Sequence, residues 1–170
     1  MYHTAQSLIE HCLLDTCHSI YAKDQVVTVL ANMAAIECCC SEIIDNHGVE
    51  LLVQFLHEAP LEGTRKCELA TVERVQQKAA IALTRLCRDT EVAQNVVDLN
   101  AVGRFVELCQ QPTLRSQSDA VLVACLGALR KISTLCGLQG ELGSSDVQQL
   151  VHAPLKDAFL NCSGVDESPV

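Results

Sequence analysis

The chain has 170 residues, of which 49% are hydrophobic and 19% charged, and its formal net charge is −9. This length allows one ordinary domain or a few small repeats, and the composition is that of a folded chain. The negative charge argues against nonspecific nucleic-acid binding, because such binding requires many Lys and Arg side chains facing phosphates. Aromatic residues make up only 3% and Trp is absent, so the core must consist of Leu, Val, Ala, Ile and Cys.

The sequence contains 11 cysteines, an odd number. Most of them fall inside apolar helical stretches, where Cys behaves as a small hydrophobic residue. The first residues, "MYHTAQSLIEHC", lack the basic and apolar regions of a secretory signal, so we expect reduced thiols and a cytoplasmic protein. The longest run without a charged residue, 25–36, is too short to cross a bilayer, which predicts a soluble protein.

Apolar residues recur at helical spacing along the chain, and polar breaks with Pro or Gly separate the helices. The breaks are 57–68, 110–118 and the segment "CGLQGELGSSD". Two long helices each carry an apolar stripe at i, i+4, i+7 and i+11, formed by Val75, Ala79, Ala82 and Leu86, and by Val121, Cys125, Ala128 and Ile132. No segment alternates with period two between hairpin signals, so we predict an all-α domain.

The sequence also repeats itself. Residues 43–53, "IIDNHGVELLV", align without a gap on 96–106, "VVDLNAVGRFV", at an offset of 53. The same offset places 29–34 on 82–87, and 128–133 forms a third copy 46 residues further on. Each copy therefore predicts one long apolar helix, a short polar break and a second helix.

These segments resemble armadillo repeats, in which helix triplets stack into a right-handed solenoid whose final helices line a concave groove. Several blocks in the same order, "KDQVVTVLANM", "ERVQQKAA", "SDAVLVACLGALRK", "DVQQLV" and a terminal E-S-x-V, are also similar to the C-terminal region of Inscuteable-family adaptors. The resemblance covers about 21–170. It implies an armadillo-like α-solenoid of about three repeats, with the following divisions: 1–20, the closing helix of a truncated preceding repeat; 21–57, 69–110 and 118–162, the repeats; and 163–170, a flexible tail.

The resemblance also implies a function. Inscuteable-family adaptors link the apical polarity complex, through the PDZ scaffold Bazooka, to Pins-type TPR proteins that orient the spindle in asymmetric cell division. The family's N-terminal segment, which engages the TPR domain, has no counterpart here. We therefore expect a cytoplasmic, cortical adaptor without a cofactor, which carries only the polarity end of that link.

The last four residues, Glu167, Ser168, Pro169 and Val170, match a PDZ ligand. A PDZ domain adds such a tail as a strand, holds its carboxylate in backbone N–H groups and buries the last side chain. Val170 fits the apolar pocket, and Ser168 fits the domain class that prefers a hydroxyl two places earlier. The tail "SGVDESPV" has no apolar periodicity, so we expect it to be accessible, the alternative being an ordinary frayed terminus.

A second candidate site is the groove of the solenoid. Asn32 matches the ladder of Asn residues with which armadillo repeats bind a peptide backbone, whereas Arg85 and Lys131 replace it in the next copies. Arg74, Lys78 and Arg85 share one face of a helix and could clamp an acidic peptide, although a solvated helix face explains them equally well. The alternative function is thus a module that carries peptide cargo, as karyopherin-type receptors do, but the Trp expected beside the ladder is absent.

Two further functions have weaker support. The run Cys38 to Cys40 suggests a metal site, but consecutive helical residues point about 100° apart and no C-x-x-C pair exists. A thiol-dependent enzyme would require one especially reactive cysteine. The sequence contains no Gly-rich phosphate loop, G-x-S-x-G or H-E-x-x-H, so we expect neither a metal nor catalysis.

Overall fold

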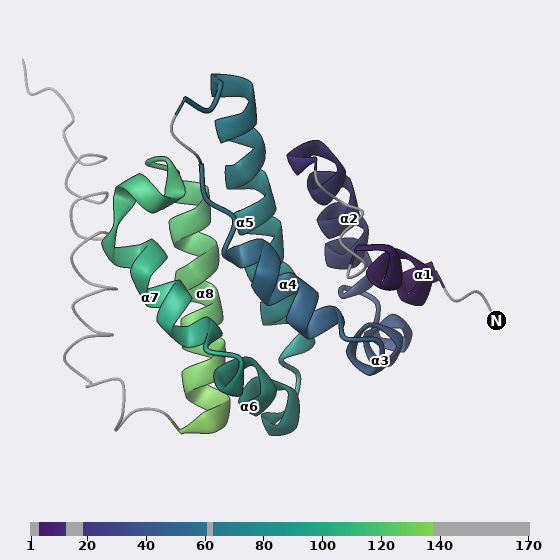
Figure 1. Ribbon diagram of the computed structural model, residues 1–170. Coiled ribbons are helices and arrows are strands. Elements are labelled where there is room, and N and C mark those ends of the chain that lie inside the picture. The colour runs from purple at the N-terminus through teal and green to yellow at the C-terminus, as the bar shows by residue number, and fades with distance from the viewer. Residues whose placement is uncertain (1–3, 13–18, 61–62, 138–170) are drawn as a thin grey trace, which may run out of the picture. The chain divides into compact units, whose positions relative to one another are not determined.

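The computed structural model describes residues 4–12, 19–60 and 63–137 (Figure 1). These residues contain helices and loops and no strand, which confirms the all-α prediction for this part of the chain. The elements are α1 (Thr4–His11), α2 (Ile20–Met33), α3 (Glu37–Asp45), α4 (Gly48–Leu56), α5 (Lys66–Leu86), α6 (Thr90–Asp98), α7 (Ala101–Gln110), the 3-10 helix η2 (Pro112–Arg115) and α8 (Asp119–Cys136).

The helices follow a repeated order of one long and two short elements. The long helix α2 is followed by the short α3 and α4, and the long α5 by the short α6 and α7, before the long α8. Helix α5 packs between α2 and α8, so that the three long helices form one layer (Figure 1). Helix α4 packs against α5, and α7 against α8, so the second short helix of each pair covers the long helix that follows it.

The short elements correct one prediction. The second helix expected in the first two copies is in each case two helices, because the backbone turns sharply at His47 between α3 and α4 and at Asn100 between α6 and α7. Both residues have a left-handed conformation, with φ of 62° and 58°. That conformation ends a helix, and it is uncommon for residues other than Gly. The two residues are separated by the same offset of 53 that relates the sequence copies, so backbone and sequence share one register.

The predicted apolar stripes of the long helices form the core. All eight stripe residues of α5 and α8 are at most 1% exposed. The short helices pack large side chains against the long helices, among them Leu52 of α4 and Phe105 of α7, both fully buried. Phe105 and Phe55 are the aromatic residues of the core in the described part of the chain, so close packing there relies mainly on aliphatic residues and Cys, as the composition predicts.

Long polar side chains donate hydrogen bonds to backbone carbonyl groups at helix ends of a neighbouring copy. The last carbonyl groups of a helix have no partner within it. Arg85 of α5 donates from Nη1 to the Ala31 carbonyl of α2 (2.6 Å), and the buried Arg104 of α7 donates from Nε to the Leu56 carbonyl of α4 (3.2 Å). The fully buried Gln76 donates from Nε2 to Glu58 O (2.8 Å) and Leu114 O (3.0 Å), which joins two loops. The second copy, which contains α5 and α7, therefore supplies hydrogen bonds that the helix ends of the first copy lack.

The cysteines should differ strongly in reactivity. Cys38 and Cys67 are exposed, whereas Cys87 and Cys125 are buried. Burial raises the pKa of Cys87 to about 12, which leaves almost no thiolate, the reactive form, at neutral pH. We expect iodoacetamide to modify Cys38 and Cys67 first in the native protein, and Cys87 and Cys125 only after denaturation. Mass spectrometry of the digested protein measures this, and equal native rates at Cys87 and Cys38 would contradict the packing of α5.

Candidate functional site

The predicted groove residues lie on the three long helices. Asn32 is in the last turn of α2, Arg74, Lys78 and Arg85 are on α5, and Lys131 is on α8. Lys78 is half-buried, and the other four are exposed. The spacing of the α5 residues places them on the flank that faces α2, because Arg74 and Lys78 both bind a carboxylate of α2 and Arg85 binds a carbonyl group of α2.

That carboxylate belongs to Asp24, which is only 5% exposed. Arg74 Nε lies 3.1 Å from Asp24 Oδ2, and Lys78 Nζ lies 2.7 Å from Asp24 Oδ1. Lys78 Nζ also donates to Thr28 Oγ1 at 2.6 Å. A buried carboxylate is stable only when it is paired and hydrogen-bonded, so these contacts tie α2 to α5. They also mean that two of the predicted groove cations are already partly neutralised within the protein.

Beyond this ion-pair cluster lies a hollow of about 170 Å³ between α2 and α5. Its lining consists of Thr28, Ala31, Asn32, Lys78, Ile81 and Arg85. Three of the five predicted groove residues therefore come together at one place. Arg74 and Lys131 do not line the hollow, so the predicted stripe is not a continuous cationic row there.

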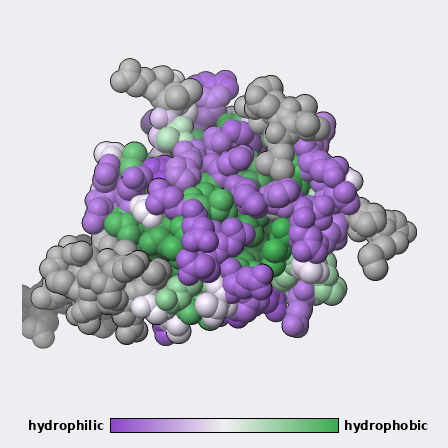
Figure 2. Space-filling view, turned by 60° about the horizontal axis from the view of Figure 1, so that its bottom comes forward, coloured by the Kyte–Doolittle hydropathy of each residue, from purple (hydrophilic) through white to green (hydrophobic). Residues whose placement is uncertain are grey.

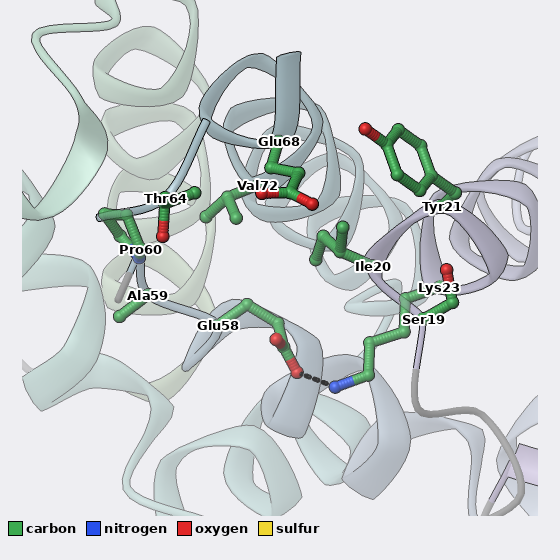
Figure 3. A pocket seen from close by; sticks show the side chains of 10 residues that line it. All are labelled: Ser19, Ile20, Tyr21, Lys23, Glu58, Ala59, Pro60, Thr64, Glu68 and Val72. Atoms are coloured by element: carbon green, nitrogen blue, oxygen red, sulfur yellow. Dashed lines mark hydrogen bonds and ion pairs between the residues drawn. The ribbon is translucent and has the colours of Figure 1, made fainter. Parts of the chain in front are cut away.

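A larger hollow of about 350 Å³ lies at the other end of α2 and α5, beside the loop that follows α4 (Figure 3). Figure 3 shows Ile20 and Val72 on its apolar side and the ion pair of Lys23 with Glu58 at its rim. Hydrogen bonds from Arg65 hold the pKa of Glu68, which also lines it, below its usual value. The charges at this rim largely balance, which favours no charged ligand. Sequence reasoning missed the hollow because its residues come from three separated segments.

The three consecutive cysteines do not form a ligand set. Cys38 is exposed, Cys39 is half-buried and Cys40 is buried, so the three side chains lie in different surroundings. Within the described ranges, no three His, Cys, Asp or Glu residues are placed to hold a metal ion together. The four residues of the predicted PDZ ligand, Glu167 to Val170, lie outside the described residues.

Comparison with known proteins identifies the family. A family model described as "Protein inscuteable C-terminal" matches residues 3–170, which is nearly the whole chain. The chain belongs to the inscuteable family. Two curated inscuteable relatives agree with this: "Protein inscuteable homolog" of Mus musculus is 53% identical over 150 residues, and that of Homo sapiens is 51% identical over 150 residues.

The inscuteable relatives are much longer proteins. In both alignments the match covers 87% of this chain but only 25% of the relative, so the chain spans about a quarter of their length. No solved structure matches the chain.

The outer face of this inscuteable chain is mostly polar. Seen from the side of α3 and α6, hydrophilic side chains cover most of it, and apolar side chains emerge between them (Figure 2). Among the described helices, none combines the length and hydrophobicity needed to span a membrane. Among the described residues, the large apolar side chains that are exposed are those of Tyr21, Val29, Ile36 and Val123, each on or beside a long helix.

Proposed function

We propose that this inscuteable-family chain is a protein-binding adaptor whose C-terminal tail binds a PDZ domain of a Bazooka-type polarity scaffold. The observation that carries this proposal is the sequence Glu167-Ser168-Pro169-Val170 in a chain of this family. The family resemblance supplies the setting, which is spindle orientation in asymmetric cell division at the apical cell cortex. Contact with Pins-type TPR proteins is assigned to other parts of the longer family members.

We also propose that the helical domain is an armadillo-like right-handed solenoid. Its support is the repeated order of long, short and short helices and the left-handed residues His47 and Asn100, which share the sequence offset. In such a stack each repeat contacts mainly its neighbours, which suits a platform that presents binding segments to other proteins. This role is one of binding rather than catalysis.

The tail proposal is tested by replacing Val170 with Asp. An aspartate would bring a charge into the apolar pocket that accepts the last side chain, where no partner awaits it. We expect the affinity for a Bazooka-type PDZ domain, measured by isothermal titration calorimetry, to fall about thirtyfold or more, as is typical when an anchor residue is lost.

The matched control is Val165→Asp, which adds the same charge to the same tail outside the last four residues. This variant should keep the wild-type affinity. If Val170→Asp binds as well as the wild type, the tail is not the contact. If both variants lose affinity equally, charge repulsion rather than pocket filling explains the loss, and the PDZ-ligand proposal fails.

The second candidate function is peptide binding by the open flank of the long helices. The hollow formed by Asn32, Lys78 and Arg85 favours it, because these side chains offer hydrogen-bond donors of both the amide and the cationic kind. Arg74 and Lys131 extend the same flank on either side along α5 and α8.

A further inference from the structure

We propose that the hollow between α2 and α5 binds one carboxylate side chain of an extended partner peptide, with apolar peptide residues on the α8 side. This inference rests on the peptide-binding candidate above and names the chemistry of its ligand. It is independent of the PDZ tail. Three observations carry it: the balance of charges at the hollow, the hydrogen-bonding groups of Arg85 and Asn32, and the small and apolar side chains on the neighbouring helix α8.

The charge balance favours one anionic group. The carboxylate of Asp24 is shared by Arg74 and Lys78, so these three residues together keep one positive charge. Arg85 adds a second positive charge at the hollow, and none of the residues that line the hollow is acidic. Without Asp24 the flank would carry three cations and would suit a run of acidic residues. With Asp24 present, the surplus of positive charge falls from three to two, and it lies around Lys78 and Arg85.

The free hydrogen-bonding groups are suited to a carboxylate. The guanidinium of Arg85 uses Nη1 to bind Ala31 O, and a guanidinium has further N–H groups in a fixed fork that matches carboxylate oxygens. Asn32 is exposed, and its side-chain amide lies at the same hollow. A volume of about 170 Å³ leaves ample room for the carboxylate of an Asp or Glu side chain.

The next long helix repeats this site only in part. At the offset of 46 residues that relates α5 to α8, Arg85 corresponds to Lys131, but Lys78 corresponds to Ala124 and Ile81 to Gly127. Val123, one residue before Ala124, is 63% exposed, the largest exposure among the large apolar residues described. A peptide that leaves the hollow toward α8 therefore meets small and apolar side chains before it reaches the single cation of Lys131. This predicts a ligand with one acidic residue and apolar neighbours.

The probe for this proposal is a phage-displayed library of random dodecapeptides, selected on the immobilised whole chain. We expect the enriched peptides to share one Asp or Glu flanked by apolar residues. A selected peptide is then synthesised with the acidic residue and with its amide, and the dissociation constants are measured by fluorescence polarisation against wild type, Arg85→Ala, Asn32→Ala and Arg130→Ala. Arg130 is an exposed arginine of α8 away from the hollow, so its variant is the matched control.

The expected result is a double-mutant cycle with coupling. Arg85→Ala and the amide peptide should each weaken binding about tenfold, and together no more than either alone, because both remove the same charged hydrogen bonds. Asn32→Ala should weaken binding less, and Arg130→Ala should not change it. A urea titration of Arg85→Ala, with Arg85→Lys as a folded charge-retaining variant, separates lost binding from lost structure.

Three outcomes would overturn the proposal: no enrichment of peptides, enrichment without an acidic residue, or additive effects of the two changes. Displacement of the peptide by equimolar inorganic phosphate would also overturn it, since it would show a general anion site. The PDZ affinity of Arg85→Ala is measured in parallel. That affinity should equal the wild-type value, so failure at the hollow and failure of the tail are distinguished.

Discussion

Replacing Phe105 with Ala should lower the free energy of unfolding by about 3–5 kcal/mol. Phe105 lies on α7, is fully buried, and is among the largest side chains of the described core. Its removal leaves a cavity between α7 and α8 that the surrounding helices can close only in part. Urea unfolding followed by far-UV circular dichroism measures the change.

The copy related by the sequence offset supplies the control. Leu52 occupies the equivalent position on α4, so Phe105→Leu places there a residue that the repeat already accommodates. We expect this variant to cost less than about 1.5 kcal/mol. The exposed Val123→Ala should change stability by less than about 0.5 kcal/mol. A loss below about 1 kcal/mol for Phe105→Ala would show that α7 does not pack against α8 as described.

Gly48→Ala should destabilise the protein by about 2–3 kcal/mol, although Ala normally favours a helix more than Gly does. Gly48 is the first residue of α4, where a Cβ atom would lie 2.4 Å from Ile43 Cγ2 and 2.6 Å from the Ile43 carbonyl oxygen. The side-chain contact could relax by a rotamer change, but the contact with the backbone oxygen requires α4 to move away from α3.

The opposite substitution in the other copy is the control. Ala101 begins α7 at the position equivalent to Gly48, and it is fully buried with its Cβ atom in place. Ala101→Gly should cost about 1 kcal/mol, from lost helix propensity and lost burial. Thermal unfolding of the two variants compares them directly. If Gly48→Ala is neutral or stabilising, α3 and α4 are farther apart than this structure places them.

The fold could be predicted largely from local patterns. The stripe that begins at Val75 and the stripe that begins at Val121 are set by helical periodicity, which depends only on neighbours in the sequence, and both proved to be buried. The breaks at His47 and Asn100 were missed because a left-handed residue other than Gly leaves no reliable mark in a sequence. Their shared offset of 53 could have suggested them, since an Asp two residues before the break and a polar residue at the break recur in both copies.

The candidate site could be predicted only in part. Helical spacing correctly placed Arg74, Lys78 and Arg85 on one face. It could not show that Asp24, more than 45 residues earlier in the chain, would pair with the first two, because such a contact depends on how α2 and α5 pack. Asp24 is the last charged residue before the uncharged run 25–36. A charged residue directly before such a run can be a signal of a buried ion pair. The predicted tail residues, Glu167 to Val170, lie outside the described part of the chain and remain a prediction.

Arg85 and Arg104, which donate to carbonyl groups at helix ends of the first copy, also determine where the chain can be shortened without loss of cooperative folding. The carbonyl of Leu56 receives its partner from Arg104, and that of Ala31 from Arg85, so the first copy gains hydrogen bonds from the second. A chain shortened after α4 would retain its helix-forming sequence but lose these donors and the cover of α5. Its unfolding should then become broad, because coupling between neighbours is what makes a stack of repeats melt as one cooperative unit. A minimal autonomous fragment must therefore include α5 and α7 together with the helices that precede them.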